Sequence, residues 1–345
     1  MKGGMASIDA KATTQEVEGE PPDRSGVQLP VWDSGSAPGS DVHGAQDENS
    51  PPLVPLQALD ELWFQVSGTV CNLRCHHCFI SCSPENHSFW FMTREQVARA
   101  LDASESLGVK EYYFTGGEPF MNREMEGILE DTLRRGPATV LTNATLIPER
   151  RARALARLRD GSRYSLELRV SLDGIDPEMN DAIRGEGAFH RCMEGVENLV
   201  THGFLPIITC MRSWPEEKTD AMLASFRTLL AEVGYHRARI KILPPLLLGE
   251  EARRSRGYEE TERVTHEMLH GFDMGELLCS RARLVSAQGV HACPILLDAP
   301  SARLGDSLEE AVGRPAALAE QACFTCYMSG SICSNAPAGG GWESQ

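Results

Sequence analysis

The central part of the chain alternates between short apolar runs and segments whose apolar residues recur every three or four positions. Six runs have the length and composition of buried strands, and helical patterns separate them. The six runs are residues 62–69, 109–115, 138–142, 164–172, 205–211 and 238–243. Strands that alternate with helices predict a parallel sheet with helices outside it. We therefore expect an α/β fold, a partial (βα)6 parallel barrel.

Capping signals mark the expected helix boundaries. Thr93 and Gln96 have the spacing of a capping box, and Asn122 is a candidate cap for the next helix. Pro148 suits the first turn of a third helix. Glycines follow the last apolar positions of four helical patterns, at Gly108, Gly136, Gly203 and Gly234. In such folds the chemistry lies at the carboxyl ends of the strands, so the loops that follow the strands are the places to search.

The two ends of the chain lack this pattern. The N-terminal stretch is rich in Gly, Pro, Ser and acidic residues, and such a composition does not bury enough apolar surface to offset its ordering entropy. Near the other end, residues 283–295 predict a β-hairpin with its turn at Gln288 and Gly289. We expect four regions: a disordered tail at 1–57, a barrel core at 58–245, a small Cys-rich iron–sulfur module at 246–335 and a flexible C-terminus at 336–345.

Charge and cysteine content narrow the function classes. A net charge of −16 argues against nucleic-acid binding, and we interpret the basic stretch 150–163 as a solvated helix face. No apolar run is long enough for a membrane span, and no signal core begins the sequence. We expect a cytoplasmic protein, in which eleven cysteines indicate metal or redox chemistry rather than disulfides. Cys192 and Cys210, on a predicted helix and strand, are expected in the core.

The first cysteine group follows the first predicted strand directly. Cys71, Cys75 and Cys78 are spaced as C-x3-C-x2-C in one loop. Soft thiolates favour iron–sulfur clusters, zinc or Cu(I). Three of them can hold three irons of a cubane and leave the fourth iron open to another ligand. A zinc site and a cluster used only for electron transfer are the alternatives. Cys82 is interpreted as a spare thiol, with a fourth-ligand role as the alternative.

This spacing after a first strand resembles the signature of the radical S-adenosylmethionine (SAM) superfamily. The resemblance covers roughly residues 62–335, as several motifs in the same order. His77 departs from it, because the family often has an aromatic residue there, although histidine is also a planar ring. The resemblance implies a [4Fe–4S] cluster that binds SAM and breaks its S–C5′ bond with one electron. The 5′-deoxyadenosyl radical then abstracts a substrate hydrogen.

A glycine-rich stretch ends the second predicted strand. Thr115, Gly116, Gly117 and Glu118 stand there, one βα unit after the cysteine group. Glycines allow a ligand to approach the backbone closely. The stretch resembles the family's motif for the methionyl amine of SAM, so these four residues are expected to bind the cofactor.

Further polar residues stand at later strand ends. Ser171 and Asp173 end the fourth strand and can bind ribose hydroxyls or the methionyl part of SAM. Arg184 is a candidate clamp for the SAM carboxylate, with a surface helix position as the alternative. Asn143, at the end of the third strand, is a further expected contact.

The second cysteine group lies in the C-terminal region. Cys279 and Cys293 flank the predicted hairpin, and Cys323, Cys326 and Cys333 follow. This arrangement resembles a shortened SPASM or twitch domain, the auxiliary-cluster module of many radical SAM enzymes. It implies one auxiliary [4Fe–4S] cluster held by the first four cysteines, with Cys333 either replacing one of them or remaining free. Zinc, which four thiolates also bind well, is the alternative.

These features lead to one leading function and two alternatives. We expect a radical SAM oxidoreductase or maturase that abstracts hydrogen from a peptide, protein or secondary metabolite, with the auxiliary cluster accepting an electron or binding substrate. A one-electron donor such as flavodoxin or ferredoxin is the expected partner. The alternatives are a twitch-type dehydrogenase of a small molecule and a non-catalytic iron–sulfur scaffold or electron carrier. A scaffold would not need the SAM contacts at Gly116, Gly117, Ser171 and Asp173. The sequence does not name the substrate.

Overall fold

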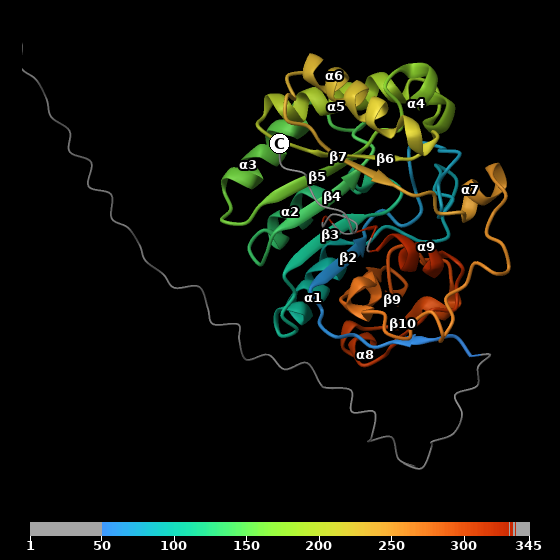
Figure 1. Ribbon diagram of the computed structural model, residues 1–345. Helices are drawn as coiled ribbons and strands as arrows, with labels where there is room; N and C mark the ends of the chain where they lie inside the picture. Colours follow the sequence, from blue (N-terminus) through green and yellow to red (C-terminus); the bar gives the residue numbers. More distant parts are fainter. Residues whose placement is uncertain (1–49, 331, 334, 336–345) are drawn as a thin grey trace, which may run out of the picture.

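The computed structural model describes residues 50–330, 332, 333 and 335. A nine-stranded sheet runs through this part of the chain (Figure 1), in the order β10-β9-β8-β2-β3-β4-β5-β6-β7. Six strands pair in parallel in chain order, and these are β2 (Glu61–Gln65), β3 (Glu111–Thr115), β4 (Ala138–Thr142), β5 (Leu166–Ser171), β6 (Ile207–Met211) and β7 (Arg239–Leu243). The predicted α/β class and the six parallel strands are confirmed.

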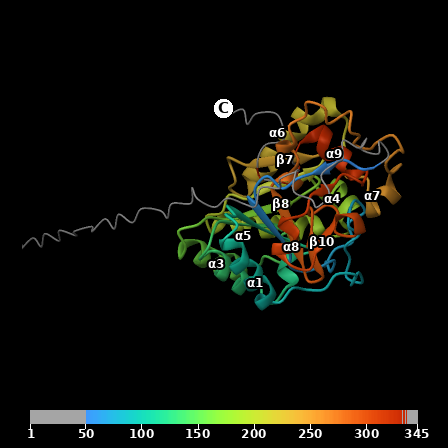
Figure 2. The ribbon, with the colours of Figure 1, turned by 90° about the horizontal axis from the view of Figure 1, so that it is seen from below.

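Helices connect these strands along the outer face of the sheet. They are α1 (Arg94–Glu105), α2 (Met125–Thr132), α3 (Glu149–Asp160), α4 (Pro177–Arg184), α5 (Ala188–Thr201) and α6 (Thr219–Glu232). Figure 2 shows α1, α3 and α5 gathered on this face. The apolar stripe of α1, with Val97 and Leu101, is buried against the sheet, as its helical spacing predicts. The outer helices therefore leave the inner face of the sheet free for function.

Local capping is partly as predicted. The capping box of α1 is present, because Thr93 Oγ1 accepts from the Gln96 amide and the Gln96 side chain accepts from Thr93 N. The cap assigned to Asn122 is wrong, since Glu124 holds that position. Asn122 ends a 3-10 turn, and its side chain is drawn inward to donate to the carbonyls of Val66 and Met92 at 2.8 Å each.

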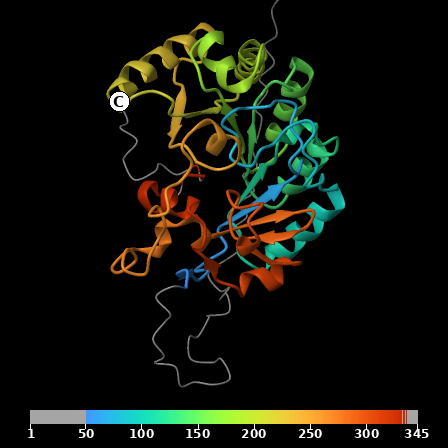
Figure 3. The ribbon, with the colours of Figure 1, turned by 90° about the vertical axis from the view of Figure 1, so that its right-hand side faces the viewer.

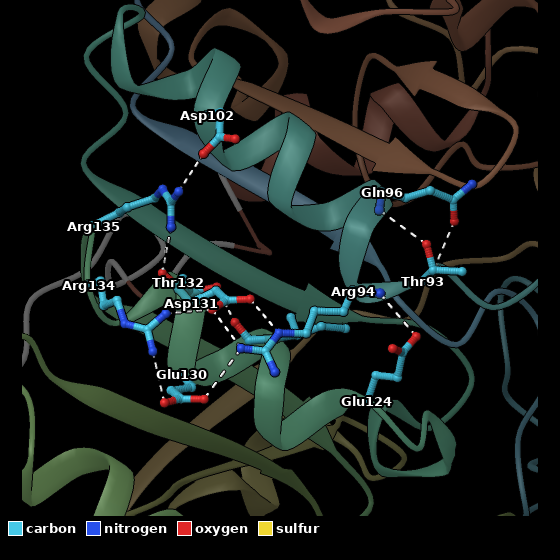
Figure 4. A network of polar contacts seen from close by, with 11 residues as sticks. Thr93, Arg94, Gln96, Asp102, Glu124, Glu130, Asp131, Thr132, Arg134 and Arg135 are labelled. Atoms are coloured by element: carbon cyan, nitrogen blue, oxygen red, sulfur yellow. Dashed lines mark hydrogen bonds and ion pairs between the residues drawn. The ribbon is translucent and has the colours of Figure 1, made fainter.

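A polar network joins α1 to α2 on the outer surface (Figure 4). Arg94 pairs with Asp131, with 2.5 Å between Nε and Oδ2, and Arg135 bonds Asp102 and Glu105. Because most of these side chains are partly exposed, each pair contributes no more than about 1 kcal/mol. The network fixes how the two helices sit together, while the buried apolar faces supply most of the stability.

The inner face of the parallel sheet curves around one cavity. Each of the six parallel strands contributes at least one lining residue, among them Trp63, Thr115, Leu141, Arg169, Thr209 and Leu243. Side chains alternate across a strand, so this convergence requires a curled sheet. The sheet remains open, because β7 and β10 are its two edges among the described strands. The arrangement is a partial barrel.

The C-terminal region extends the same sheet beyond β2. Strand β8 (Ala282–Ser286) pairs in parallel with β2, while β9 (Gly289–His291) and β10 (Arg303–Gly305) continue antiparallel. The hairpin predicted over 283–295 is present as β8 and β9. Figure 3 shows these elements, in orange to red, at the opposite end of the molecule from α5 and α6. The remaining elements here are α7 (Gly249–Arg254), α8 (Leu308–Val312), α9 (Ala322–Ser329) and the 3-10 turns Met274–Glu276, Leu278–Ser280 and Pro300–Ala302; two more turns, Pro119–Met121 and Glu216–Lys218, lie in the barrel.

Part of the segment predicted as a tail takes part in this region. Strand β1 (Leu53–Val54) pairs antiparallel with β11 (Ala316–Ala317). Residues 1–49 and the predicted C-terminal segment 336–345 lie outside the described residues. None of the described helices is long and apolar enough to cross a membrane.

Candidate active site

The loop after β2 brings the first cysteine group to the carboxyl edge of the sheet. Cys71, Cys75 and Cys78 all line the barrel cavity, whose empty space, its open mouth included, is about 1330 Å³. All three cysteines are free thiols. Three soft donors on one loop, beside open space, fit a cluster that leaves one iron for an exchangeable ligand.

The loop that carries Cys71, Cys75 and Cys78, called the cluster loop below, is fixed by backbone hydrogen bonds from several sides. Cys71 N donates to the Ser83 carbonyl at 3.1 Å, and His76 N donates to the carbonyl of Ile183 at the end of α4 at 2.8 Å. The Cys78 carbonyl accepts from Glu250 N, in the first turn of α7, at 2.9 Å. The positions of the thiols are therefore set by elements far apart in the sequence.

The thiols of the loop differ in acidity. Burial raises the pKa of Cys71 to about 12 and that of Cys75 to about 11. A hydrogen bond from the Cys82 thiol lowers the pKa of Cys78 below its usual value, and the same bond raises the pKa of Cys82. Binding a metal at this loop must therefore displace protons from Cys71 and Cys75. Cys82 also lines the cavity, beside Cys78.

The two glycines after β3 allow the backbone around Ser67 and Val70, just before the cluster loop, to pack closely against them. A Cβ on Gly116, whose φ is +150°, would lie 2.1 Å from Ser67 Oγ, and a Cβ on Gly117 would lie 2.2 Å from the Val70 carbonyl oxygen. Gly117 N also donates to the Gly68 carbonyl at 3.0 Å. Thr115, Gly116 and Gly117 line the cavity as well. The glycines thus serve close backbone packing, and contact with SAM at this place remains a prediction.

The side chain of Glu118 lies outside the cavity lining and is fully buried. Its carboxylate accepts from Phe120 N at 3.1 Å, Thr142 Oγ1 at 2.8 Å and Asn143 N at 2.8 Å. Burial raises its pKa, and these hydrogen bonds oppose the rise. The side chain ties the end of β3 to the end of β4, so any SAM contact by this residue would come from its backbone.

Asn143 lines the cavity but its side chain is engaged with the cluster loop. Its Nδ2 lies 2.9 Å from Asn72 Oδ1 and 3.9 Å from Cys71 Sγ. Its Oδ1 accepts from Thr145 N at 3.0 Å. The residue therefore orients Cys71 and the backbone beside it.

A buried ionic cluster joins the strand end after β5 to the cluster loop. Asp173 Oδ2 lies 2.7 Å from His77 Nε2 and 2.6 Å from Arg184 Nε, while Oδ1 accepts from Met211 N at 2.7 Å. Burial alone would raise the pKa of Asp173, but Arg184 and then His77 hold it well below its usual range. Asp173 and Arg184, both predicted as SAM contacts, form an ion pair at the cavity wall, and their contact with SAM remains a prediction. Ser171 lines the same wall.

Several cavity residues were not found by sequence reasoning. Trp63, Arg169, Thr209 and Met211 line the cavity from the strands, and Ile332 lines it from the C-terminal segment. Arg169 stands in a strand two positions before Ser171, so alternation puts both on the inner face. The available signal was an arginine on the same side of the strand as Ser171.

The second cysteine group forms a separate site. Cys279, Cys293, Cys323 and Cys326 line one smaller cavity, whose empty space, its open mouth included, is about 470 Å³ and whose other lining residues are apolar. Cys323 and Cys326 are three positions apart on α9, which places both on one face of the helix. Cys333 lines the first cavity instead, although its thiol contributes to the raised pKa of Cys326.

Burial and a nearby cation shape the chemistry of this second site. Burial raises the pKa of all four thiols, to about 12 for Cys279. Arg283 is fully buried and donates to the carbonyls of Cys279 and Ala282 at 2.8 Å each. Burial lowers its pKa to about 10, and the thiols of Cys279 and Cys293 oppose this shift. The hydrogen-bond partners described for Arg283 are carbonyl oxygens, none of them a carboxylate.

The cysteine donors of both sites suit a multi-iron cluster. Among the residues that the structure describes, no group of three or more His, Cys, Asp or Glu side chains could hold a metal ion. The ligands of a cubane stand at its corners, farther apart than ligands around one ion. Thiolate donors are those that iron–sulfur clusters take.

Comparison with known proteins identifies the family. Residues 66–225 match the Radical SAM superfamily, from the cluster loop to α6. The chain is similar to the GTP 3',8-cyclase of Yersinia pestis, with 31% identity over 135 residues, which cover 39% of this chain and 40% of the relative. It is also similar to the antilisterial bacteriocin subtilosin biosynthesis protein AlbA of Bacillus subtilis (strain 168), with 31% identity over 152 residues, 44% of this chain and 32% of the relative. The chain thus matches less than half the length of these two relatives.

A solved structure shares the fold. The crystal structure of Streptococcus suis SuiB bound to precursor peptide SuiA aligns with a TM-score of 0.56 at 17% identity, over 75% of this chain and 64% of that one. The family implies SAM and a [4Fe–4S] cluster, and the three thiols on the cluster loop fit that cluster. Residues 66–225 of this chain form a radical SAM superfamily domain.

Proposed function

We propose that this enzyme abstracts a hydrogen atom from a peptide or a peptide-like metabolite and uses a second, auxiliary [4Fe–4S] cluster. The observation that carries the proposal is the separation of two cysteine sites within one curved sheet. Three thiols line the larger cavity, and four thiols line a smaller one that is otherwise apolar. When bound, the two groups supply one-electron chemistry, the first cleaving SAM and the second accepting an electron or holding substrate.

The residues around the first site would bind and orient. Cys71, Cys75 and Cys78 hold the cluster, with Asn143 keeping Cys71 in place through the cluster loop. The Asp173–Arg184 pair fixes His77 and braces the loop against β5. Apolar side chains such as Trp63, Leu141 and Leu243 would limit the contact of water with the reacting region, which would protect a reactive radical.

The buried positive charge of Arg283 is evidence for an anionic group at the second site. A fully buried guanidinium without a carboxylate partner is costly unless another negative charge lies nearby. Its pKa responds to the thiols of Cys279 and Cys293, so these sulfurs are its electrostatic neighbours. Four thiolates with iron carry the negative charge that this cation lacks, which supports an auxiliary cluster there.

The substrate class rests on the relatives and is part of the proposal. AlbA is named for the biosynthesis of a bacteriocin, and SuiB was solved with a precursor peptide. The GTP 3',8-cyclase similarity favours a second candidate, a small-molecule substrate in the same cavity. In both cases an external donor such as flavodoxin or ferredoxin would supply the electron for SAM cleavage.

The test is iron and sulfide analysis of anaerobically reconstituted enzyme, with a dithionite assay for 5′-deoxyadenosine. We expect about eight irons per chain and release of 5′-deoxyadenosine. About four irons with release would remove the auxiliary cluster from the proposal. Zinc in place of iron at both sites would contradict it entirely.

A further inference from the structure

We propose that Arg169 and Thr209 form a subsite on the inner wall of the barrel that binds an anionic oxygen group of the substrate, a carboxylate or a phosphate. The inference rests on the proposed function, because it takes this cavity as the place where substrate meets SAM. The mechanism described above leaves both residues without a role.

Arg169 is a buried cation with unused hydrogen-bonding capacity. Its side chain is 3% exposed and lines the cavity from β5. Nη1 donates to the Cys333 carbonyl, and Nε has no hydrogen-bond partner among the residues that the structure describes. A buried guanidinium N–H without an acceptor is costly, so this group suits an acceptor that arrives with a ligand.

Thr209 offers a second unused group on the neighbouring strand. It is 8% exposed and lines the same cavity, and within the described part of the chain its Oγ1 has no hydrogen-bond partner. In the parallel register, Arg169 stands opposite Ile207, two positions before Thr209. Positions two apart face the same side of a strand, so both side chains converge on the inner face. A guanidinium N–H and a hydroxyl together can bind two oxygens of one anion.

The charge of the lining favours an anion. Asp173 is the acidic residue among the lining residues, and Arg184 and His77 already pair with it. Lys241 lies opposite Thr209 in register on β7, and its pKa is lowered to about 8 by burial and then by Arg169. The positive charges on β5 and β7 are therefore close together, and a ligand anion would relieve their repulsion.

The position of Arg169 distinguishes this subsite from the region of the cluster loop. Arg169 precedes Ser171 by two residues, which is about 7 Å farther from the carboxyl edge of the sheet. Cys333, Tyr113 and Glu61 are the groups that act on its pKa, whereas Arg184 responds to Asp173 and Cys75. Trp63, Leu141 and other apolar side chains complete the wall. The cavity is thus suited to a molecule with an apolar body and an acidic group.

The test uses the reconstituted holoenzyme with SAM. Its three probes, phenylacetate, phenylphosphonate and phenylacetamide, share a phenyl ring and differ in their polar group. Equilibrium dialysis measures their dissociation constants. We expect at least one acid to bind about tenfold more tightly than the amide, as charge-assisted hydrogen bonds to a buried arginine require. Preference for phenylacetate assigns a carboxylate, and preference for phenylphosphonate assigns a phosphate.

Variants locate the preference on the two residues. Arg169→Gln is expected to abolish the difference between acid and amide, and Thr209→Val to reduce it severalfold. Arg99→Gln, at an exposed arginine of α1, is the matched control and should leave it unchanged. If Arg169→Gln loses iron, the acid-over-amide preference of Thr209→Val alone decides whether the subsite exists. Equal binding of acid and amide by the wild type, or a preference that survives in a loaded variant, would overturn the subsite. Failure to form 5′-deoxyadenosine, measured on the same wild-type sample, would instead overturn the proposed function.

Discussion

The two cysteine sites of this chain share their donor atoms but differ in cavity size, in lining and in the number of thiols. The first lies on a loop beside the larger cavity, among polar side chains that bond one another. The second lines a smaller cavity whose other lining residues are apolar, and burial raises the pKa of each of its four thiols. Three thiols leave one iron of a cubane open to an exchangeable ligand, whereas four thiols are enough to ligate all four irons.

Charge balance shows the same contrast. At the first site the buried carboxylate of Asp173 pairs with the Arg184 guanidinium at 2.6 Å and lies 2.7 Å from His77 Nε2, so the protein itself supplies the balancing charge. At the second site the hydrogen-bond partners described for the buried Arg283 are carbonyl oxygens, and the thiols of Cys279 and Cys293 are the groups that oppose the lowering of its pKa. Under the proposed function, an anionic cluster would supply the charge balance at the second site.

The largest expected effect is the loss of SAM cleavage in Cys75→Ala. Removing one of three cluster thiols should reduce 5′-deoxyadenosine formation by more than about 100-fold, beyond what loss of an outer-shell group costs. Chromatographic measurement of 5′-deoxyadenosine in the dithionite assay checks this. Cys210→Ala, a buried cysteine of β6 outside both cavities, should keep most of the activity. Retained cleavage in Cys75→Ala would show that the first cluster is misplaced.

The next effect separates the second site from the first. Cys293→Ala should lose about four irons per chain and keep substrate-independent SAM cleavage, because the two cavities share none of the four thiols. Iron analysis beside the 5′-deoxyadenosine assay measures both. Unchanged iron content would place the auxiliary cluster elsewhere.

Asp173→Asn tests the charge balance of the first site. The change leaves Arg184 buried without its carboxylate, so the free energy of unfolding should fall by about 3 kcal/mol. Asp131→Asn, which breaks the more exposed pair with Arg94 in Figure 4, should cost no more than about 1 kcal/mol. Urea unfolding followed by circular dichroism compares the two variants. Equal losses would mean that Asp173 is not the hub of the site.

Arg283→Met tests the charge balance of the second site. Removing a buried cation beside the auxiliary cluster should make its reduction potential more negative by about 60 mV or more, a tenfold change in equilibrium for one electron. Arg283→Lys keeps the charge and should stay closer to the wild type. A redox titration followed by electron paramagnetic resonance gives the potentials, and an unchanged potential in Arg283→Met would separate Arg283 from the cluster.

The smallest effect is expected for Cys333→Ala. Because Cys333 lines the first cavity and not the second, the variant should keep the wild-type iron content. Loss of about four irons would instead make Cys333 an auxiliary ligand, the alternative that its sequence position left open.

Much of the fold and both cysteine groups could be predicted because their signals are local. Strand periodicity, the Thr93 capping box and the C-x3-C-x2-C spacing each lie within a short stretch of sequence. The contacts between side chains inside the site could not be predicted from the sequence, because they join distant positions such as His77 and Asp173, which are 96 residues apart. The same holds for Glu118, whose buried carboxylate bonds the end of the next strand. Arg169 was visible as an arginine on the same side of its strand as Ser171, but that its Nε has no partner among the described residues depends on the packed cavity.

The most direct test of two separate clusters is iron counting with Mössbauer spectroscopy on the wild type and on a variant with Cys71, Cys75 and Cys78 all changed to alanine. We predict about eight irons in the wild type and about four in the variant, with spectra of a remaining [4Fe–4S] cluster and no 5′-deoxyadenosine. A wild type with about four irons, all of them lost in the variant, would contradict the account.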